Sequence, residues 1–226
     1  MTTGRSLGRI DPYDPPDPAD FPPGRVGWRP DPRRAALLVH DMQRYFLRPF
    51  GPGDRPLPGL LTGLAALVRN CRAAGVPVIY TAQPGRQTPQ ERGLLTDMWG
   101  AGIGGVVDTA PELEAIVDEV APEPGDLQLV KWRYSAFQRT PLRAELTRLG
   151  RDQLLITGVY ASIGCLATAI EAFMLDVQPF LVGDGVADFS RADHDTAIDW
   201  VARRCGVVTS LAEVSAALAP VPAEGR

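Results

Sequence analysis

The chain has 226 residues, of which 45% are apolar and 22% charged, and its formal net charge is −4. This length and apolar content support one well-buried core, which we interpret as a single domain. The lysines and arginines are scattered along the chain, which excludes a nucleic-acid-binding stripe and favours a small-molecule ligand.

The first 32 residues form a proline-rich arm. Its eight prolines rule out regular helix or sheet ladders, and composition leaves open whether the arm is disordered or lies across the body or a partner subunit. Residues 1–10 lack the continuous apolar stretch of a secretory signal, and no run in the chain approaches the roughly 20 apolar residues that span a bilayer. We therefore expect a cytoplasmic protein that binds no membrane.

From Arg34 onward, short aliphatic runs alternate with helical patterns. The predicted strands are 35–40, 77–82, 127–132, 153–160, 179–184 and 206–210. The predicted helices are 57–74, 88–98, 111–119, 140–149, 163–176 and 191–204, with Thr140 and Pro141 as cap and first turn of the fourth. Runs that are apolar on both faces indicate a parallel sheet between helix layers. The predicted fold is α/β, a three-layer doubly wound sheet of six mainly parallel strands over 33–220, followed by a tail at 221–226.

In an open parallel sheet the ligand binds outside the carboxyl ends of the strands. Asp41 follows the first predicted strand, Gln83 follows the second, and Lys131 ends the third. Tyr160 and Gly164 follow the fourth. Four strands therefore bring polar or special residues to one edge of the sheet.

Two of these residues suit acid chemistry. Asp41 comes directly after a buried strand, where burial can raise a carboxyl pKa and make the group a general acid or base; capping of the next turn is the alternative. The Lys131 ammonium would lie partly inside a sheet edge. That position is costly unless the ammonium meets an anion or reaches solvent on its long stem.

The pattern of segment 80–100 predicts a loop and a short helix over this edge of the sheet, and these carry Arg92 and Trp99. The alternative is that the charged helix surface only faces solvent and binds nothing. The run GAGIGG (100–105) matches the dinucleotide-binding fingerprint letter for letter. No predicted strand precedes it, and the fingerprint needs a strand, a tight turn and a helix. We therefore reject nucleotide binding.

Two other sets of residues could supply a catalytic nucleophile, but the sequence around each does not match what that chemistry needs. Ser162, Asp184 and His194 follow the chain order of an α/β-hydrolase triad, but Tyr160 stands where the nucleophile elbow needs glycine. Cys165 lies near a predicted helix start, but its apolar neighbours favour a buried structural thiol.

The chain has three cysteines and two histidines. The odd number and wide spacing of the cysteines predict reduced thiols and fit no close-spaced zinc pattern. A site built on several imidazoles is excluded by number, so metal chemistry would have to rest on carboxylates.

Six segments between about Pro32 and Val214 together resemble the isochorismatase family. They are RRAALLVHDMQRYF (33–46), YTAQPG (80–85), RGLLTDMWG (92–100), KWRYSAF (131–137), GVYASIGC (158–165) and DGVADFS (184–190). The resemblance is closest to the branch that holds the isochorismatase of siderophore pathways and the dihydro-hydroxyanthranilate synthase of phenazine-type pathways. It implies a six-stranded parallel sheet with helices on both faces.

The amidase members of this family use an Asp, Lys and Cys triad. Asp41 and Lys131 match the first two positions, whereas the nucleophile position matches Gly164, with Cys165 one residue later. The branch that cleaves vinyl ethers also has glycine there. The resemblance therefore implies acid catalysis without a covalent intermediate, with Asp41, Lys131 and Gly164 as the catalytic positions.

The resemblance also implies a substrate pocket and the absence of a cofactor. The residues that match pocket-lining positions are Phe46, Gln83, Arg92, Trp99, Tyr134 and Tyr160. Ser162 departs from the histidine of this branch. Metal-binding relatives carry histidines after the second strand, and QPGRQT (83–88) has none, so no metal and no cofactor are expected.

The reaction implied is hydrolysis of an enolpyruvyl ether. Asp41, kept protonated by a desolvated site, would protonate the terminal CH₂, after which water adds and pyruvate leaves. Because a nearby cation lowers a carboxyl pKa, we expect Lys131 to direct its charge mainly at a substrate carboxylate. Arg92 would clamp a carboxylate, oriented by Gln83 and Tyr160.

The ring substituent distinguishes two substrates, 2-amino-2-deoxyisochorismate and isochorismate. QRYFLRPF (43–50) resembles the phenazine-type branch and GVYASIGC (158–165) the siderophore branch. The sequence ends soon after the last predicted strand, without the aryl carrier domain often fused to siderophore isochorismatases, and we favour the amino substrate.

A non-catalytic binding protein is the alternative class of function, and the presence of both Asp41 and Lys131 argues against it. Helix 163–176 is apolar nearly all round, which predicts a homodimer.

Overall fold

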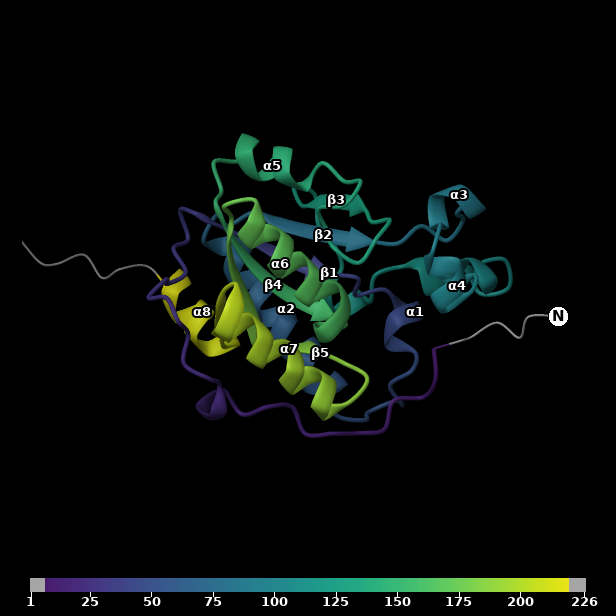
Figure 1. Ribbon diagram of the computed structural model, residues 1–226, viewed down its shortest axis with the longest axis horizontal. Helices are drawn as coiled ribbons and strands as arrows, with labels where there is room; N and C mark the ends of the chain where they lie inside the picture. The colour runs from purple at the N-terminus through teal and green to yellow at the C-terminus, as the bar shows by residue number, and fades with distance from the viewer. Residues whose placement is uncertain (1–6, 220–226) are drawn as a thin grey trace, which may run out of the picture.

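A sheet of six strands runs through the centre of the protein. Figure 1 shows the computed structural model, which describes residues 7–219. The strands are β1 (Ala35–His40), β2 (Val78–Ala82), β3 (Leu127–Val130), β4 (Gln153–Val159), β5 (Gln178–Ala187) and β6 (Val207–Thr209). Their order is β3-β2-β1-β4-β5-β6, and every neighbouring pair is parallel. The predicted fold class is confirmed, and each predicted strand is present.

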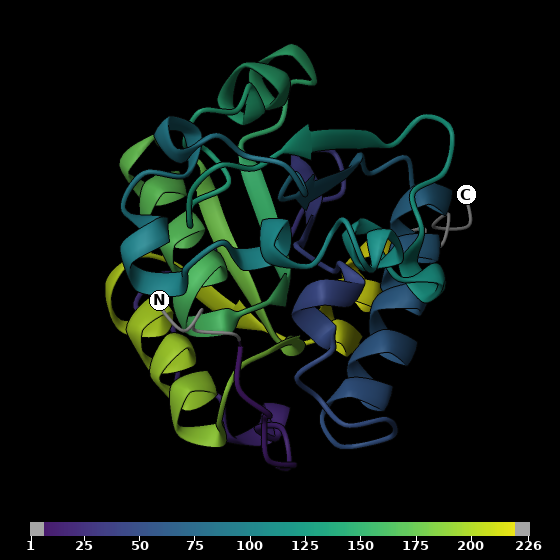
Figure 2. The same cartoon turned by 90° about the vertical axis from the view of Figure 1, so that its right-hand side faces the viewer.

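Helices cover both faces of this sheet (Figures 1 and 2). Helices α2 (Leu57–Ala73) and α8 (Leu211–Leu218) pack together on one face, and α5 (Leu142–Arg148), α6 (Leu166–Met174) and α7 (Arg191–Arg204) pack on the other. Three short helices, α1 (Arg44–Leu47), α3 (Pro89–Arg92) and α4 (Leu95–Trp99), lie beyond the strand ends. None of the helices in the described range is long and apolar enough to cross a membrane.

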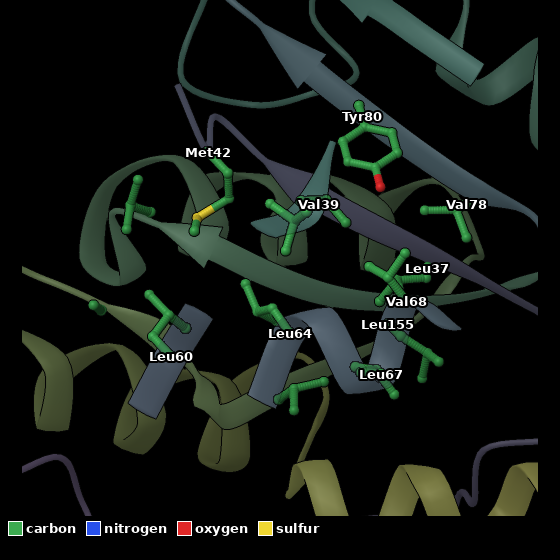
Figure 3. Close-up of a cluster of buried hydrophobic side chains, with 14 of the residues drawn as sticks. Leu37, Val39, Met42, Leu60, Leu64, Leu67, Val68, Val78, Tyr80 and Leu155 are labelled. Atoms are coloured by element: carbon green, nitrogen blue, oxygen red, sulfur yellow. The ribbon is translucent and has the colours of Figure 1, made fainter. Parts of the chain in front are cut away.

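The two faces of β1 explain why its sequence is apolar throughout. Leu37 and Val39 point towards α2, where Leu64 and Leu67 meet them (Figure 3). Leu38 belongs to the core cluster on the opposite face. Successive strand residues alternate between faces, so a strand covered on both sides must be apolar at every position. This burial fixes the register that sets where each strand ends.

The proline-rich arm lies across the body of the protein. Ile10 forms an isolated bridge with Phe50, and the only helical turn in the described part of the arm is the 3₁₀ turn η1 (Pro18–Asp20). The backbone N–H of Asp188 donates to the Tyr13 hydroxyl over 2.8 Å, which ties the arm to the end of β5. Residues 1–6 of the arm and the tail at 221–226 lie outside the described residues.

Several predicted helices differ from those in the structure. The helix expected at 88–98 is divided into α3 and α4, because Gly93 takes a φ of 54° between them. The helix expected at 111–119 consists of two 3₁₀ turns, η3 (Pro111–Glu114) and η4 (Asp118–Val120). The helix expected at 163–176 is preceded by a π turn, η5 (Ala161–Cys165), and ends at Met174. A 3₁₀ turn, η2 (Gly102–Gly105), precedes η3 in the chain.

Candidate active site

A cavity of about 620 Å³, part of it open to solvent, lies at the carboxyl ends of the central strands. Its position outside the carboxyl ends of parallel strands is where this kind of sheet binds ligands. All nine residues predicted as catalytic or substrate-binding line it. They are Phe46, Asp41, Gln83, Arg92, Trp99, Lys131, Tyr134, Tyr160 and Gly164. The structure therefore brings together side chains from four strand ends, and their roles stay predictions.

The Asp41 carboxylate lies at the floor of the cavity, where β1 ends. Asp41 takes a φ of 49°, a left-handed conformation that aspartate tolerates better than most residues, and this turn directs the side chain away from the strand. One carboxylate oxygen accepts from the Thr81 hydroxyl over 2.8 Å, and the other faces the Gln83 amide at 3.3 Å. The side chain is buried.

Lys131 pairs with Asp41. Its Nζ lies 2.9 Å from Asp41 Oδ2, and only 1% of the lysine is exposed. The same ammonium donates to the backbone carbonyls of Arg133 over 2.6 Å and of Tyr134 over 3.4 Å. Three acceptors match the three protons of an ammonium, so the ion pair is fully hydrogen-bonded despite its burial.

This pair corrects the expected charge state of the site. Burial raises the pKa of Asp41, but the Lys131 ammonium and the hydrogen bonds to the carboxylate outweigh burial, so the pKa lies below its ordinary value. Asp41 is therefore ionised at neutral pH in the unliganded protein, not kept protonated. In the unliganded protein Lys131 directs its charge at Asp41, because the two side chains meet inside a dry site.

His40, the last residue of β1, is the unpredicted polar member of the floor. Its Nδ1 lies 2.8 Å from the Val159 carbonyl oxygen and 3.9 Å from Asp41 Oδ2, and its Nε2 lies 3.3 Å from the Tyr134 carbonyl oxygen. Burial lowers the pKa of His40, so the ring is neutral at pH 7. The shorter contact assigns the single proton to Nδ1, which donates to Val159.

Arg92 brings an unpaired positive charge to the opposite wall. Its Nε donates to the Gly100 carbonyl over 2.5 Å and one terminal nitrogen to the Gln87 side chain over 3.3 Å. Within residues 7–219, no carboxylate forms an ion pair with this guanidinium, although only 7% of Arg92 is exposed. Burial disfavours the charged form of the guanidinium and therefore lowers the pKa of Arg92. A buried cation without a counterion favours an anionic ligand.

The glycine-rich run 100–105 supports Arg92. Gly102 has a φ of 58°, and a Cβ at this position would lie 2.3 Å from a terminal nitrogen of Arg92. The run follows α4 and forms the 3₁₀ turn η2, so it lacks the preceding strand of a dinucleotide-binding loop. Close approach to the guanidinium explains the glycine without a nucleotide.

Aromatic rings form a continuous wall beside the charged groups. Phe189 stacks between Tyr160 and Trp99, with ring centroids 4.1 Å and 6.2 Å away. The Trp99 indole N–H donates to the Tyr134 hydroxyl over 2.6 Å. The Tyr160 hydroxyl donates its proton to the Phe46 carbonyl over 2.6 Å. Tyr160 therefore offers the cavity its ring, and its hydroxyl proton is not free for a substrate carboxylate. The expectation that Tyr160 orients a substrate carboxylate is therefore revised.

Sequence reasoning missed about half of the lining residues. The unpredicted ones are Leu7, His40, Tyr45, Leu95, Gly102, Ile103, Val159, Ile163 and Phe189. Phe189 could have been found, because it lies in DGVADFS (184–190), one of the segments that resemble the family. Leu7 belongs to the proline-rich arm, and no local sequence pattern places it at the cavity.

The alternative nucleophiles are not assembled. His194 Nε2 donates to the Gly183 carbonyl over 2.8 Å, the Asp184 carboxylate accepts from the first backbone N–H of α8, and no hydrogen bond among the described residues joins either to Ser162. Cys165 is fully buried, and burial raises its pKa far above the ordinary value, so its thiol is protonated. Within residues 7–219, no group of three His, Cys, Asp or Glu side chains could hold a metal ion.

Comparisons with known proteins agree with this geometry. A family model described as "Isochorismatase domain" matches residues 35–213. The chain is 50% identical over 200 residues to "Isochorismatase" of Bacillus subtilis, which covers 88% of this chain but only 63% of the relative's length. It is 47% identical over 206 residues to "Phenazine biosynthesis protein PhzD" of Pseudomonas fluorescens, covering 91% of this chain and 96% of that one. A solved cysteine hydrolase from Pseudomonas syringae has the same fold, with a TM-score of 0.73 at 23% identity over 88% of this chain and 98% of its own.

Proposed function

The chain belongs to the isochorismatase family of hydrolases, and from this premise we propose that it hydrolyses the enolpyruvyl ether of 2-amino-2-deoxyisochorismate. The products are 2,3-dihydro-3-hydroxyanthranilate and pyruvate, and the proposed setting is secondary-metabolite biosynthesis in the cytoplasm. The observation that carries the proposal is the buried Asp41–Lys131 pair beside Gly164. The pair supplies an acid and a cation at a position where no nucleophilic side chain is present.

Substrate recognition rests on the imbalance of charge in the cavity. Asp41 neutralises Lys131, whereas Arg92 has no acidic partner among the described residues. A substrate with two carboxylates can place one against the Arg92 guanidinium and bring the other towards Lys131. The aromatic wall of Trp99, Phe189 and Tyr160 packs against the cyclohexadiene ring.

Binding prepares Asp41 to act as the acid. A substrate carboxylate beside Lys131 competes for its ammonium, which removes the main cause of the low Asp41 pKa and leaves burial to raise it. Binding of the dicarboxylate is thus coupled to uptake of one proton at Asp41. Shifting the pKa of a carboxyl costs about 1.4 kcal/mol per unit, which the new ion pairs offset.

The chemical step transfers this proton to carbon. The Asp41 O–H bond breaks as a C–H bond forms at the terminal CH₂, and the enol ether becomes an oxocarbenium ion. Water adds to the cationic carbon and returns a proton to the Asp41 carboxylate. The hemiketal hydroxyl then passes its proton to the ring oxygen as the C–O bond breaks, which gives pyruvate and the ring alcohol. When the products leave and Lys131 pairs again with Asp41, the carboxyl returns to solvent the proton that it took up on binding.

Isochorismate is the second candidate substrate. The 50% identity to the isochorismatase of Bacillus subtilis and the segment 158–165 favour it, whereas segment 43–50 and the similarity to the phenazine protein favour the amine. The two substrates should be compared at matched concentrations, with pyruvate followed through lactate dehydrogenase and NADH. We expect a higher kcat/KM for the amine. The reverse order would assign the chain to isochorismate, and absence of pyruvate from both would refute the proposed function.

We also propose that the protein is a homodimer through α6. Phe173 and Met174 at the end of this helix are 47% and 67% exposed, whereas Ala169 and Ala172 face the sheet. Covering such apolar side chains is the usual reason for association. Sedimentation at micromolar concentration should give twice the monomer mass, and Phe173→Glu should give the monomer. A monomeric unmodified protein would contradict the proposal.

A further inference from the structure

Gly164 is in a position where the backbone does not require glycine. It lies within η5, and its φ is outside the left-handed region that glycine alone adopts readily. A Cβ placed on Gly164, however, would lie 2.1 Å from His40 Cε1 and 2.7 Å from His40 Nε2. The imidazole ring therefore occupies the space that any side chain at residue 164 would need.

The ring cannot move aside without losing its contacts. His40 is 1% exposed, its Nδ1 donates to the Val159 carbonyl over 2.8 Å, and its Nε2 faces the Tyr134 carbonyl oxygen at 3.3 Å. Rotating it would leave the Val159 carbonyl without this donor inside a dry region, a cost of about 1 to 3 kcal/mol for a typical buried group. Steric exclusion at residue 164 is thus reinforced by the hydrogen bond from Nδ1 to Val159.

These contacts lead directly to the acid pair. The Tyr134 carbonyl oxygen, against which the unprotonated His40 Nε2 packs, accepts from Lys131 Nζ over 3.4 Å, and Lys131 pairs with Asp41 over 2.9 Å. The Val159 carbonyl lies at the end of β4, directly before Tyr160 of the aromatic wall. His40 therefore joins β1, the end of β4 and the segment after β3, the three pieces of chain that hold the floor of the cavity.

We propose that His40 and Gly164 form one positioning unit. In it the imidazole fills the side-chain space of residue 164, bonds to the end of β4 at Val159, and packs against the Tyr134 carbonyl that accepts from Lys131. The effect of this unit on turnover rests on the proposed vinyl ether hydrolysis. The exclusion of a side chain at residue 164 by the imidazole does not depend on that function. The unit also excludes thiol chemistry, because a cysteine at residue 164 needs the volume of the ring.

A double-mutant cycle tests the unit. Gly164→Ala should lower the melting temperature by more than about 5 °C, and adding His40→Ala should restore much of that loss because it empties the contested space. Gly59→Ala is the control, since a Cβ there would meet nothing within 4 Å. Strictly additive effects, a stable and fully active Gly164→Ala protein, or failure of both Gly164→Ala and the double variant to fold would overturn the proposal.

Turnover by His40 variants tests the positioning role. His40→Ala should lower kcat by about a hundredfold with KM changed by less than about threefold, because Lys131 is misplaced and the binding groups remain. His40→Asn, whose amide can donate to Val159 from near the Nδ1 position, should recover at least tenfold of that loss. Equal kcat for the Ala and Asn variants would contradict the role. Inactivity of the unmodified protein would instead refute the proposed function, while the melting-temperature cycle would still decide the steric part.

Discussion

The floor of the cavity and the segment that covers it are built in different ways. Asp41 and Lys131 of the floor are at most 3% exposed and come from strand ends whose register the core fixes. The cover, α3 and α4 with their flanking turns, exposes Leu94 and Met98 by 83% and 55%. The rigid part carries the charges for catalysis, and the part with fewer buried contacts carries Arg92 for recognition. Changes in the floor should therefore alter kcat, and changes in the cover should alter KM.

The largest effect is expected for Asp41→Asn. Asparagine has nearly the same shape and also tolerates a positive φ, so the variant should fold and bind substrate but cannot donate the proton. We expect kcat to fall by about 10²- to 10⁴-fold with little change in KM, measured by pyruvate release. Asp184→Asn is the matched control, because Asp184 only caps α8, and it should stay within about threefold of the unmodified enzyme. An Asp41→Asn enzyme that keeps most of its kcat would remove Asp41 from the mechanism.

Lys131→Met should change stability and its dependence on pH. Without the ammonium, burial dominates and the pKa of Asp41 rises above its unfolded value, the opposite of the unmodified protein. The variant's Asp41 then contributes stability only at low pH and loses it as pH rises through the raised pKa. We expect the free energy of unfolding to be about 3 to 5 kcal/mol lower at pH 8, with a smaller difference at pH 4. Denaturant titrations at both pH values measure this, and an equal difference at the two values would contradict the ion pair.

Arg92→Gln tests the cover. Removing the guanidinium should raise KM by about ten- to a hundredfold, the size of a lost charge-assisted contact, while kcat changes by less than about tenfold. The unliganded variant should be as stable as the unmodified protein or more so, because a buried cation without a counterion is removed. Arg86→Gln, which breaks only the exposed pair with Asp108, serves as the control. A fall in kcat alone would mean that the cover takes part in the chemical step.

The smallest effect is expected for Cys165→Ala. The thiol is protonated and buried, and alanine keeps the apolar character of the position. Steady-state kcat should stay within about threefold, whereas a loss of more than tenfold, about 1.4 kcal/mol of barrier, would indicate a covalent route.

The floor could be predicted more completely than the cover. Asp41 and Gly164 come after buried strands, and Lys131 follows the edge strand β3. Because the ends of parallel strands meet at one edge of the sheet, the order of the predicted strands was enough to place the three residues near one another. The 2.9 Å contact between Asp41 and Lys131 could not be derived that way. It depends on a left-handed turn and side-chain packing, and it reversed the expected protonation of Asp41.

The cover was harder because local sequence controls it weakly. The apolar and polar residues of 88–98 fit one helix, but a positive φ at Gly93 divides it. Helix α8 was missed although Ser210 and Glu213 form a capping box, a signal visible in the sequence. Leu7 reaches the cavity from the arm through contacts that no short-range pattern records.

The origin of the new methyl hydrogen of pyruvate tests the role of Asp41 most directly. If Asp41 protonates the CH₂ group, that hydrogen exchanges with solvent before transfer. Turnover in heavy water, with pyruvate trapped at once by lactate dehydrogenase and analysed by mass spectrometry, should then give one deuterium in the methyl group. Undeuterated product would show instead that the hydrogen came from ring C2 in a concerted elimination, which leaves an aromatic ring and needs no acid.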